Sequence, residues 1–155
     1  HRDLHSFPTR RSSDLSLNMS TDLLDKVASE LFPTARIVDY HGNGEFLCYP
    51  HFEYALSLAR KYNCRIRTVT NLNTYSKKRI SMLGEYVDMI CVSSDGPNKS
   101  SYENIRKGGS FKLFCENLEF LISQGRSDLI ILMTLAKDNT FCRFRRTVSF
   151  IFSNF

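Results

Sequence analysis

The chain has 155 residues, of which 42% are hydrophobic, 12% aromatic and 24% charged. This length accommodates one domain, and the composition excludes a disordered chain, a collagen-like repeat and a disulfide-rich scaffold. The formal net charge of +5 comes mainly from the two ends of the chain, so neither nucleic acid nor a membrane is an expected partner. The longest apolar run, Leu129–Leu135, is strand-sized and far shorter than the roughly 18 residues that span a bilayer.

The two ends differ in character from the rest of the chain. Residues 1–15 show no periodic pattern, no helix cap and no initiator methionine, and the segment from His5 to Leu15 resembles the in-frame translation of a sequencing adapter. We expect residues 1–15 to be non-native and not packed on the domain. Residues 142–155 hold three arginines, four phenylalanines and no acidic residue, which is typical of a frameshifted or otherwise non-native tail. The informative domain is therefore expected over residues 16–141.

The first half of this domain alternates helical and strand patterns. A helix is predicted from Ser20 or Thr21 to a stop at Pro33, with its apolar residues on one face: Leu23, Leu24, Val27, Ala28 and Leu31. The run Ala35–Tyr40 predicts a strand. Pro50 is placed to begin the next helix in its first turn, and Asn63 to end it. Residues 65–70 predict a strand with Ile66 and Thr68 on one face and Arg65, Arg67 and Val69 on the other.

The second half continues the alternation. A helix over Ser76–Tyr86 and a strand over Met89–Ser93 are followed by helices over Ser100–Lys107 and Phe111–Ser123 and a strand over Asp128–Leu135. This order predicts an α/β fold with four parallel strands that are adjacent in chain order and covered by helices. A doubly wound sheet and a (β/α) barrel cut at both ends both fit this pattern.

Polar residues and glycines follow each predicted strand, where α/β proteins collect their chemistry. In the loop Gly42-Asn43-Gly44-Glu45, the glycines allow a ligand to approach the backbone and Glu45 can accept from an ammonium group, although a tight turn also explains the loop. The third glycine of a dinucleotide-binding G-x-G-x-x-G motif is missing. Five residues are expected to face one small-molecule site, although turns and helix caps also explain them singly: Glu45, Asn71, Ser93, Asp95 and Asn139.

Taken together, the segments G-N-G-E, T-N-L-N, V-S-S-D-G and Y-E-N-I-R-K-G-G-S-F resemble the radical S-adenosylmethionine (SAM) superfamily, especially its branch with a SPASM-type auxiliary cluster domain. The resemblance covers about residues 16–139. It implies an incomplete (β/α) barrel, a partial TIM-like core with a parallel sheet, in which a [4Fe–4S] cluster and SAM lie across the strand ends. A peptide is one substrate class that this branch suggests.

The resemblance also implies roles for particular residues. Gly42, Asn43, Gly44 and Glu45 stand where the family's G-G-E motif holds the methionyl amino group of SAM, with Asn43 in place of the middle glycine. Ser93 and Asp95 match a segment that contacts SAM. Arg106 stands where a guanidinium can form a fork onto the methionyl carboxylate.

The cysteines depart from the family pattern. The family holds its cluster with a C-x-x-x-C-x-x-C loop, whereas the cysteines here stand alone, at positions 48, 64, 91, 115 and 142. We therefore assign no metal ligand, and we expect this chain to bind no cluster and to cleave no SAM. The odd cysteine count and the lack of a secretory signal predict reduced thiols in the cytoplasm. A non-enzymatic α/β binding fragment and another (β/α) barrel enzyme are the alternatives.

Overall fold

The computed structural model describes residues 18–42, 44–126 and 128–132. The predicted non-native segment 1–15, the predicted tail 142–155 and Asn139 lie outside these residues, as does Asn43 in the first strand-end loop. The elements follow one another as α1 (Thr21–Leu31), β1 (Ile37–Tyr40), the 3-10 helix η1 (Phe46–Cys48), α2 (Phe52–Lys61), β2 (Arg65–Thr70), α3 (Lys77–Tyr86), β3 (Met89–Ser93), α4 (Lys99–Ile105), α5 (Phe111–Ser123) and β4 (Ile130–Leu132).

The strands form one parallel sheet in the order β1-β2-β3-β4. The prediction of four parallel strands, adjacent in chain order, is therefore confirmed. Ile37 of β1 lies opposite Arg65 of β2, and Cys91 of β3 lies opposite Ile130 of β4. Among the described strands, each strand therefore pairs with the strand that precedes or follows it in the sequence.

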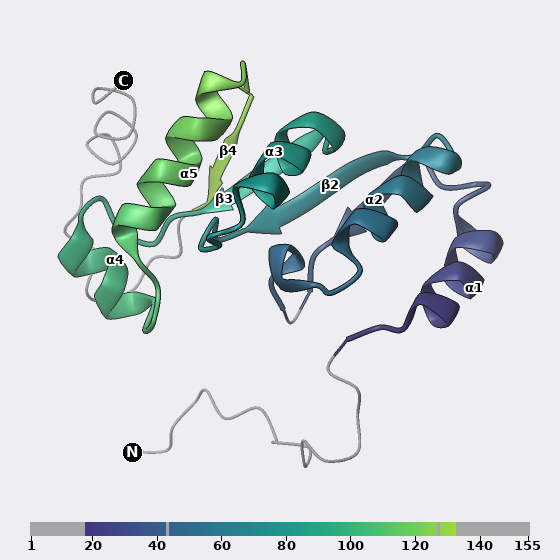
Figure 1. The fold of residues 1–155 in the computed structure, drawn as a ribbon, viewed down its shortest axis with the longest axis horizontal. Helices are drawn as coiled ribbons and strands as arrows, with labels where there is room; N and C mark the ends of the chain where they lie inside the picture. Colours follow the sequence, from purple (N-terminus) through teal and green to yellow (C-terminus); the bar gives the residue numbers. More distant parts are fainter. Residues whose placement is uncertain (1–17, 43, 127, 133–155) are drawn as a thin grey trace, which may run out of the picture.

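The two faces of the sheet have different surroundings. Figure 1 shows α2, α3 and α5 together on one side of the sheet. The side chains of β2 alternate accordingly: Ile66 and Thr68 are buried, whereas Arg65 and Arg67 are exposed on the opposite face. This alternation confirms the faces predicted for this strand, since successive side chains of a strand point to opposite sides.

The core lies between the helices and the covered face of the sheet. Along α2 the predicted apolar stripe is buried, and its members are Phe52, Ala55, Leu56 and Ala59. Along α1 only part of the predicted stripe packs: Leu24 and Ala28 are buried, but Leu23 and Leu31 remain 48% and 58% exposed. The described residues therefore cover only part of the apolar face predicted for α1.

Side-chain caps explain where most helices begin. Ser20, Ser76, Asn98 and Ser110 each accept a hydrogen bond from the backbone N–H three residues later, which satisfies a donor that the helix leaves free. The start predicted for α2 was wrong. Pro50 precedes the helix, which begins at Phe52, because η1 takes up residues 46–48 first.

The end predicted for α2 is confirmed. Asn63 adopts a left-handed φ of 57° just beyond the helix, and its N–H bonds to the carbonyl of Arg60 at 2.9 Å.

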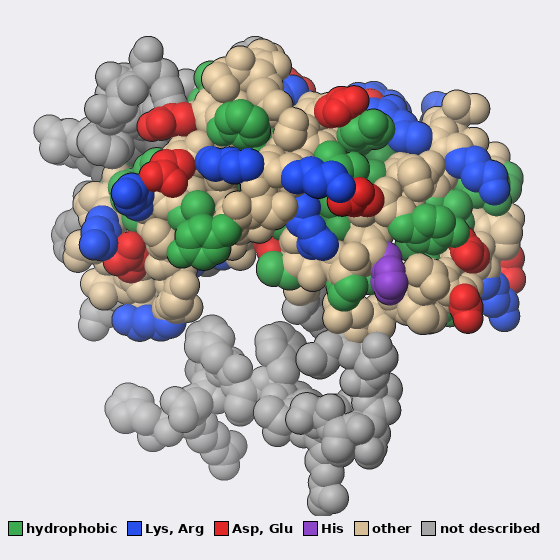
Figure 2. Space-filling model, viewed as in Figure 1, with side chains coloured by type: hydrophobic (Ala, Val, Ile, Leu, Met, Phe, Trp, Pro, Cys, Tyr) green, Lys and Arg blue, Asp and Glu red, His purple; other side chains and the backbone are tan. Residues whose placement is uncertain are grey.

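The surface carries charges of both signs. On the helix-covered face seen in Figure 2, basic and acidic side chains are interspersed rather than gathered into one basic patch. None of the helices in the described part of the chain is long and apolar enough to cross a membrane.

Candidate functional site

A cavity of about 400 Å³ opens at the carboxyl ends of β1, β2 and β3. We call it the strand-end cavity, and its lining comprises His41, Gly42, Gly44, Glu45, Val69, Thr70, Asn71, Ser93 and Arg106. A second cavity of about 580 Å³, here called the adjoining cavity, shares Asn71 and Arg106 with it and also contacts Asp95 and the Lys107–Gly109 loop. Both volumes lie within the range of small-molecule sites.

Glu45 ties the loop after β1 to the end of β2. One of its carboxylate oxygens, Oε1, accepts from the hydroxyl of Thr70 at 2.8 Å and from the N–H of Leu47 at 3.2 Å, while Oε2 accepts from the N–H of Asn71 at 2.8 Å. A carboxylate has about four lone-pair positions, so these bonds leave room for roughly one further donor. Most of the bonding capacity of Glu45 therefore holds the two loops together at the cavity, and about one acceptor position remains for a ligand.

The loop after β2 is held in an unusual conformation. Leu72 is fully buried and adopts a left-handed φ of 54°, which non-glycine residues rarely do. Asn71 accepts from the N–H of Asn73 at 2.8 Å, and Asn73 in turn accepts from the N–H of Ser110 at 2.6 Å. The loop that carries Asn71 is thus fastened to the start of α5.

Tyr102 of α4 bonds to the same loop through Asn73. Its hydroxyl accepts from Nδ2 of Asn73 at 2.6 Å, and its ring is fully buried. Burial raises the pKa of Tyr102 to about 12, so the hydroxyl stays protonated at neutral pH.

The loop after β3 brings two oppositely charged residues together. Asp95 is only 4% exposed, and its Oδ2 lies 2.6 Å from Nε of Arg106. This contact is an ion pair without hydrogen-bond geometry, because the buried Nε–H has no hydrogen-bond partner within the described residues. Gly96 allows this loop to lie close to α4, because a Cβ at position 96 would lie only 2.7 Å from the backbone nitrogen of Tyr102.

Three further side chains, from β1, β2 and the residue that follows β1, bond to one another. Nε of Arg67 donates to Oδ2 of Asp39 at 2.6 Å, and Oδ1 of Asp39 lies 2.7 Å from Nδ1 of His41. We call these residues the Arg67–Asp39–His41 triad. The strand and loop patterns of the sequence did not indicate these residues as a site. The Asp-x-His at the end of β1 is a signal in the sequence, whereas the pairing with Arg67 depends on the register of the next strand.

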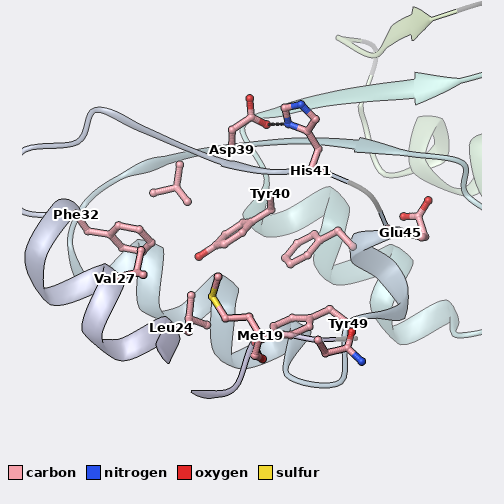
Figure 3. Close-up of a pocket in the computed structure, with 14 residues that line it drawn as sticks. Met19, Leu24, Val27, Phe32, Asp39, Tyr40, His41, Glu45 and Tyr49 are labelled. Carbon is pink, nitrogen blue, oxygen red and sulfur yellow. Dashed lines mark hydrogen bonds and ion pairs between the residues drawn. The ribbon is translucent and has the colours of Figure 1, made fainter. Parts of the chain in front are cut away.

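A groove of about 450 Å³ runs beside β1, on the other side of the loop that carries His41. Figure 3 shows it between α1 and β1, with Leu24, Val27 and Phe32 on one wall and the Asp39–His41 contact above it. His41 and Glu45 line this groove as well as the strand-end cavity. The loop after β1 therefore separates an apolar groove from a polar cavity.

The cysteines within the described residues do not form a metal site. The thiols of Cys64, Cys91 and Cys115 are fully or partly buried, and burial raises the pKa of each, which favours the neutral thiol over the thiolate that binds iron. Cys48 is exposed on η1. Across residues 18–42, 44–126 and 128–132, no group of three or more histidine, cysteine or acidic side chains is placed to hold a metal.

The structure brings most of the predicted site residues to one end of the sheet. The strand-end cavity is lined by Gly42, Gly44, Glu45, Asn71, Ser93 and Arg106, and the adjoining cavity adds Asp95. Asn43 and Asn139 lie outside the described residues. Comparison with protein-family models and with curated proteins finds no match to this chain.

Proposed function

We propose that this domain is part of a (β/α) barrel of the radical SAM superfamily and that its strand-end cavities take SAM. The observation that carries the proposal is the position of Arg106, which lines both cavities with a side chain that is 27% exposed and is paired through Nε with Asp95. A guanidinium can form two parallel hydrogen bonds to a ligand carboxylate, and such charge-assisted pairs are stronger than neutral hydrogen bonds.

The strand order supports the barrel over a doubly wound sheet. A doubly wound sheet reverses its strand order at the ligand site and carries helices on both faces. Here the described strands follow chain order, and α2, α3 and α5 lie on one side. A (β/α) barrel has the same order, with its helices outside the sheet.

The residues that line the cavities fit the amino-acid end of SAM. Arg106, which its ion pair with Asp95 holds in place, would bind the methionyl carboxylate. The remaining acceptor position of Glu45, together with the backbone around Gly42 and Gly44, would receive the ammonium group. In the family, SAM and its cluster together supply a radical that abstracts hydrogen from a substrate. The cluster does not fit the described residues, because their cysteines are dispersed.

The SAM site is tested by calorimetric titration of the full chain with SAM. We expect binding that weakens about tenfold or more in Arg106→Gln, since hydrogen bonds to charged groups contribute roughly 1.5–3 kcal/mol. Arg65→Gln is the matched control, because Arg65 is an exposed arginine at the amino-terminal end of β2, away from the cavity at the carboxyl end of that strand. The proposed SAM site is wrong if SAM does not bind, or if the two variants weaken binding equally.

The expected lack of catalysis needs a separate test. After anaerobic reconstitution with iron and sulfide, we expect no stoichiometric cluster absorbance and no 5′-deoxyadenosine from SAM, because the thiolates do not converge on one site. Cluster uptake together with SAM-dependent product would contradict this expectation. The exposed Cys48 would then be the first residue to replace.

A further inference from the structure

The Arg67–Asp39–His41 triad divides the two oxygens of one carboxylate between two partners. Asp39 and Arg67 lie directly opposite each other on β1 and β2, and both Nε and Nη2 of Arg67 donate to Oδ2. The other oxygen, Oδ1, is 2.7 Å from Nδ1 of His41, a contact that is visible in Figure 3. Arg67 therefore fixes the orientation of the carboxylate, and the carboxylate fixes the imidazole.

This arrangement selects one tautomer of His41. An ionised carboxylate only accepts hydrogen bonds, so the hydrogen of a neutral imidazole must lie on Nδ1. Burial raises the pKa of Asp39, and hydrogen bonds from Arg67 and His41 lower it by more, so the carboxyl stays ionised at neutral pH. In the neutral form of His41, Nε2 is then an unprotonated acceptor.

The imidazole is accessible from the strand-end cavity. His41 lines both that cavity and the groove beside β1, and its side chain is 51% exposed. Its chain neighbour Gly42 has no side chain to cover it. The other charged groups that line the strand-end cavity are Glu45 and Arg106.

We infer that His41 is a proton acceptor for ligands of the strand-end cavity and that Asp39 and Arg67 are its positioning residues. The ligand class is a small molecule with an O–H or N–H group. The lone pair of Nε2 takes the proton, the ligand keeps the electron pair of the broken bond, and Asp39 balances the imidazolium charge. This role goes beyond the proposed SAM site and does not depend on it.

The first test determines the tautomer by long-range ¹H–¹⁵N correlation on the labelled full chain near neutral pH, with His41→Gln to assign the signals. We expect the hydrogen on Nδ1 in the wild type. In Asp39→Asn, Arg67 can only donate and therefore holds the amide oxygen, which turns the NH2 group toward Nδ1 of His41. The hydrogen should move to Nε2. Asp128→Asn, two residues before β4, is the matched control and should leave the tautomer unchanged.

The second test measures the availability of Nε2 by carbethoxylation with diethyl pyrocarbonate, followed by peptide mass mapping. In this reaction Nε2 attacks a carbonyl carbon and ethyl carbonate leaves with the electrons of the broken C–O bond. We expect His41 to react faster than His51, and Asp39→Asn to slow His41 by about tenfold or more because its Nε2 then carries the hydrogen. His51 should react at the same rate in every variant.

A wild-type hydrogen on Nε2, or an Asp39→Asn variant with an unchanged tautomer and an unchanged His41 rate, would overturn the inference. Protection of His41 but not His51 by added SAM would support both the inference and the SAM site. Absence of protection, with the tautomer switch and the rate change intact, would count against the SAM site alone.

Discussion

Asn117 is wholly buried on α5, and its Nδ2 donates to the carbonyl oxygens of Leu72 at 2.7 Å and Thr74 at 2.8 Å. Its Oδ1 accepts from Nζ of Lys77 at 2.8 Å. One amide therefore satisfies the backbone of the strained loop after β2 and also binds the helix that follows it. Buried polar groups with all their bonds made specify one conformation of a loop, because every alternative leaves a group unsatisfied.

We predict that Asn117→Ala lowers the free energy of unfolding by about 2–3 kcal/mol, since it leaves buried carbonyls without donors. Urea denaturation measures this change. Glu119→Ala is the control on the same helix, because Glu119 is exposed, and we expect a change within about 0.5 kcal/mol. Equal effects of the two substitutions would show that the loop does not depend on Asn117.

Asp39 makes stability depend on pH in a defined direction. Burial raises the pKa of Asp39, but the hydrogen bonds from Arg67 and His41 lower it by more. The folded-state pKa therefore lies below the ordinary value of 3.8. The folded protein then binds fewer protons than the unfolded chain, so this contribution is complete above pH 3.8 and is lost as the pH falls through the folded-state value. We expect the stability difference between wild type and Asp39→Asn to shrink on acidification below pH 3.8 in denaturation at several pH values. A difference that grows on acidification would contradict this account.

At the scale of elements, predictions succeeded where the determinants are local. The bounds of α5 were predicted correctly because apolar residues recur at helical spacing after a serine cap. The helix η1 was missed because its cap, Glu45, depends on Thr70 and Asn71, which follow more than twenty residues later. No local pattern encodes such a contact.

The same distinction applies to the candidate site. Parallel topology alone predicted that Glu45, Asn71, Ser93 and Asp95 would come to one end of the sheet. The pairing of Asp95 with Arg106 could not be predicted, since it depends on how closely Gly96 lets the loop approach α4. The Arg67–Asp39–His41 triad was missed because it requires the register between β1 and β2, which the sequence does not state.

At the scale of the whole molecule, β1 forms one edge of the sheet that the structure describes. No strand among the described residues pairs with this edge, Ile37 of β1 is exposed, and so are Leu23 and Leu31 of the preceding helix α1. An open edge beside apolar side chains favours association with another chain.

We predict that the protein associates with rising concentration and that Ile37→Lys reduces this association, because a charge on an edge strand opposes pairing. Sedimentation velocity at several concentrations measures the effect. Tyr75→Lys is the control, since Tyr75 is 87% exposed and does not lie on a strand. If both substitutions reduce association equally, surface charge in general is responsible rather than the edge of β1.

The agreement between strand order and chain order also determines how the domain can be divided. A cut just after the exposed Tyr75, in the connection between β2 and α3, leaves β1 and β2 on one piece and β3 and β4 on the other, and each piece keeps its own pair of hydrogen-bonded strands. In the sheet, only the seam between β2 and β3 has to form again, aided by the bonds from Asn117 to the loop after β2. Two halves expressed separately should therefore reassemble without threading one chain through the other, as repeat proteins do when they grow by whole units.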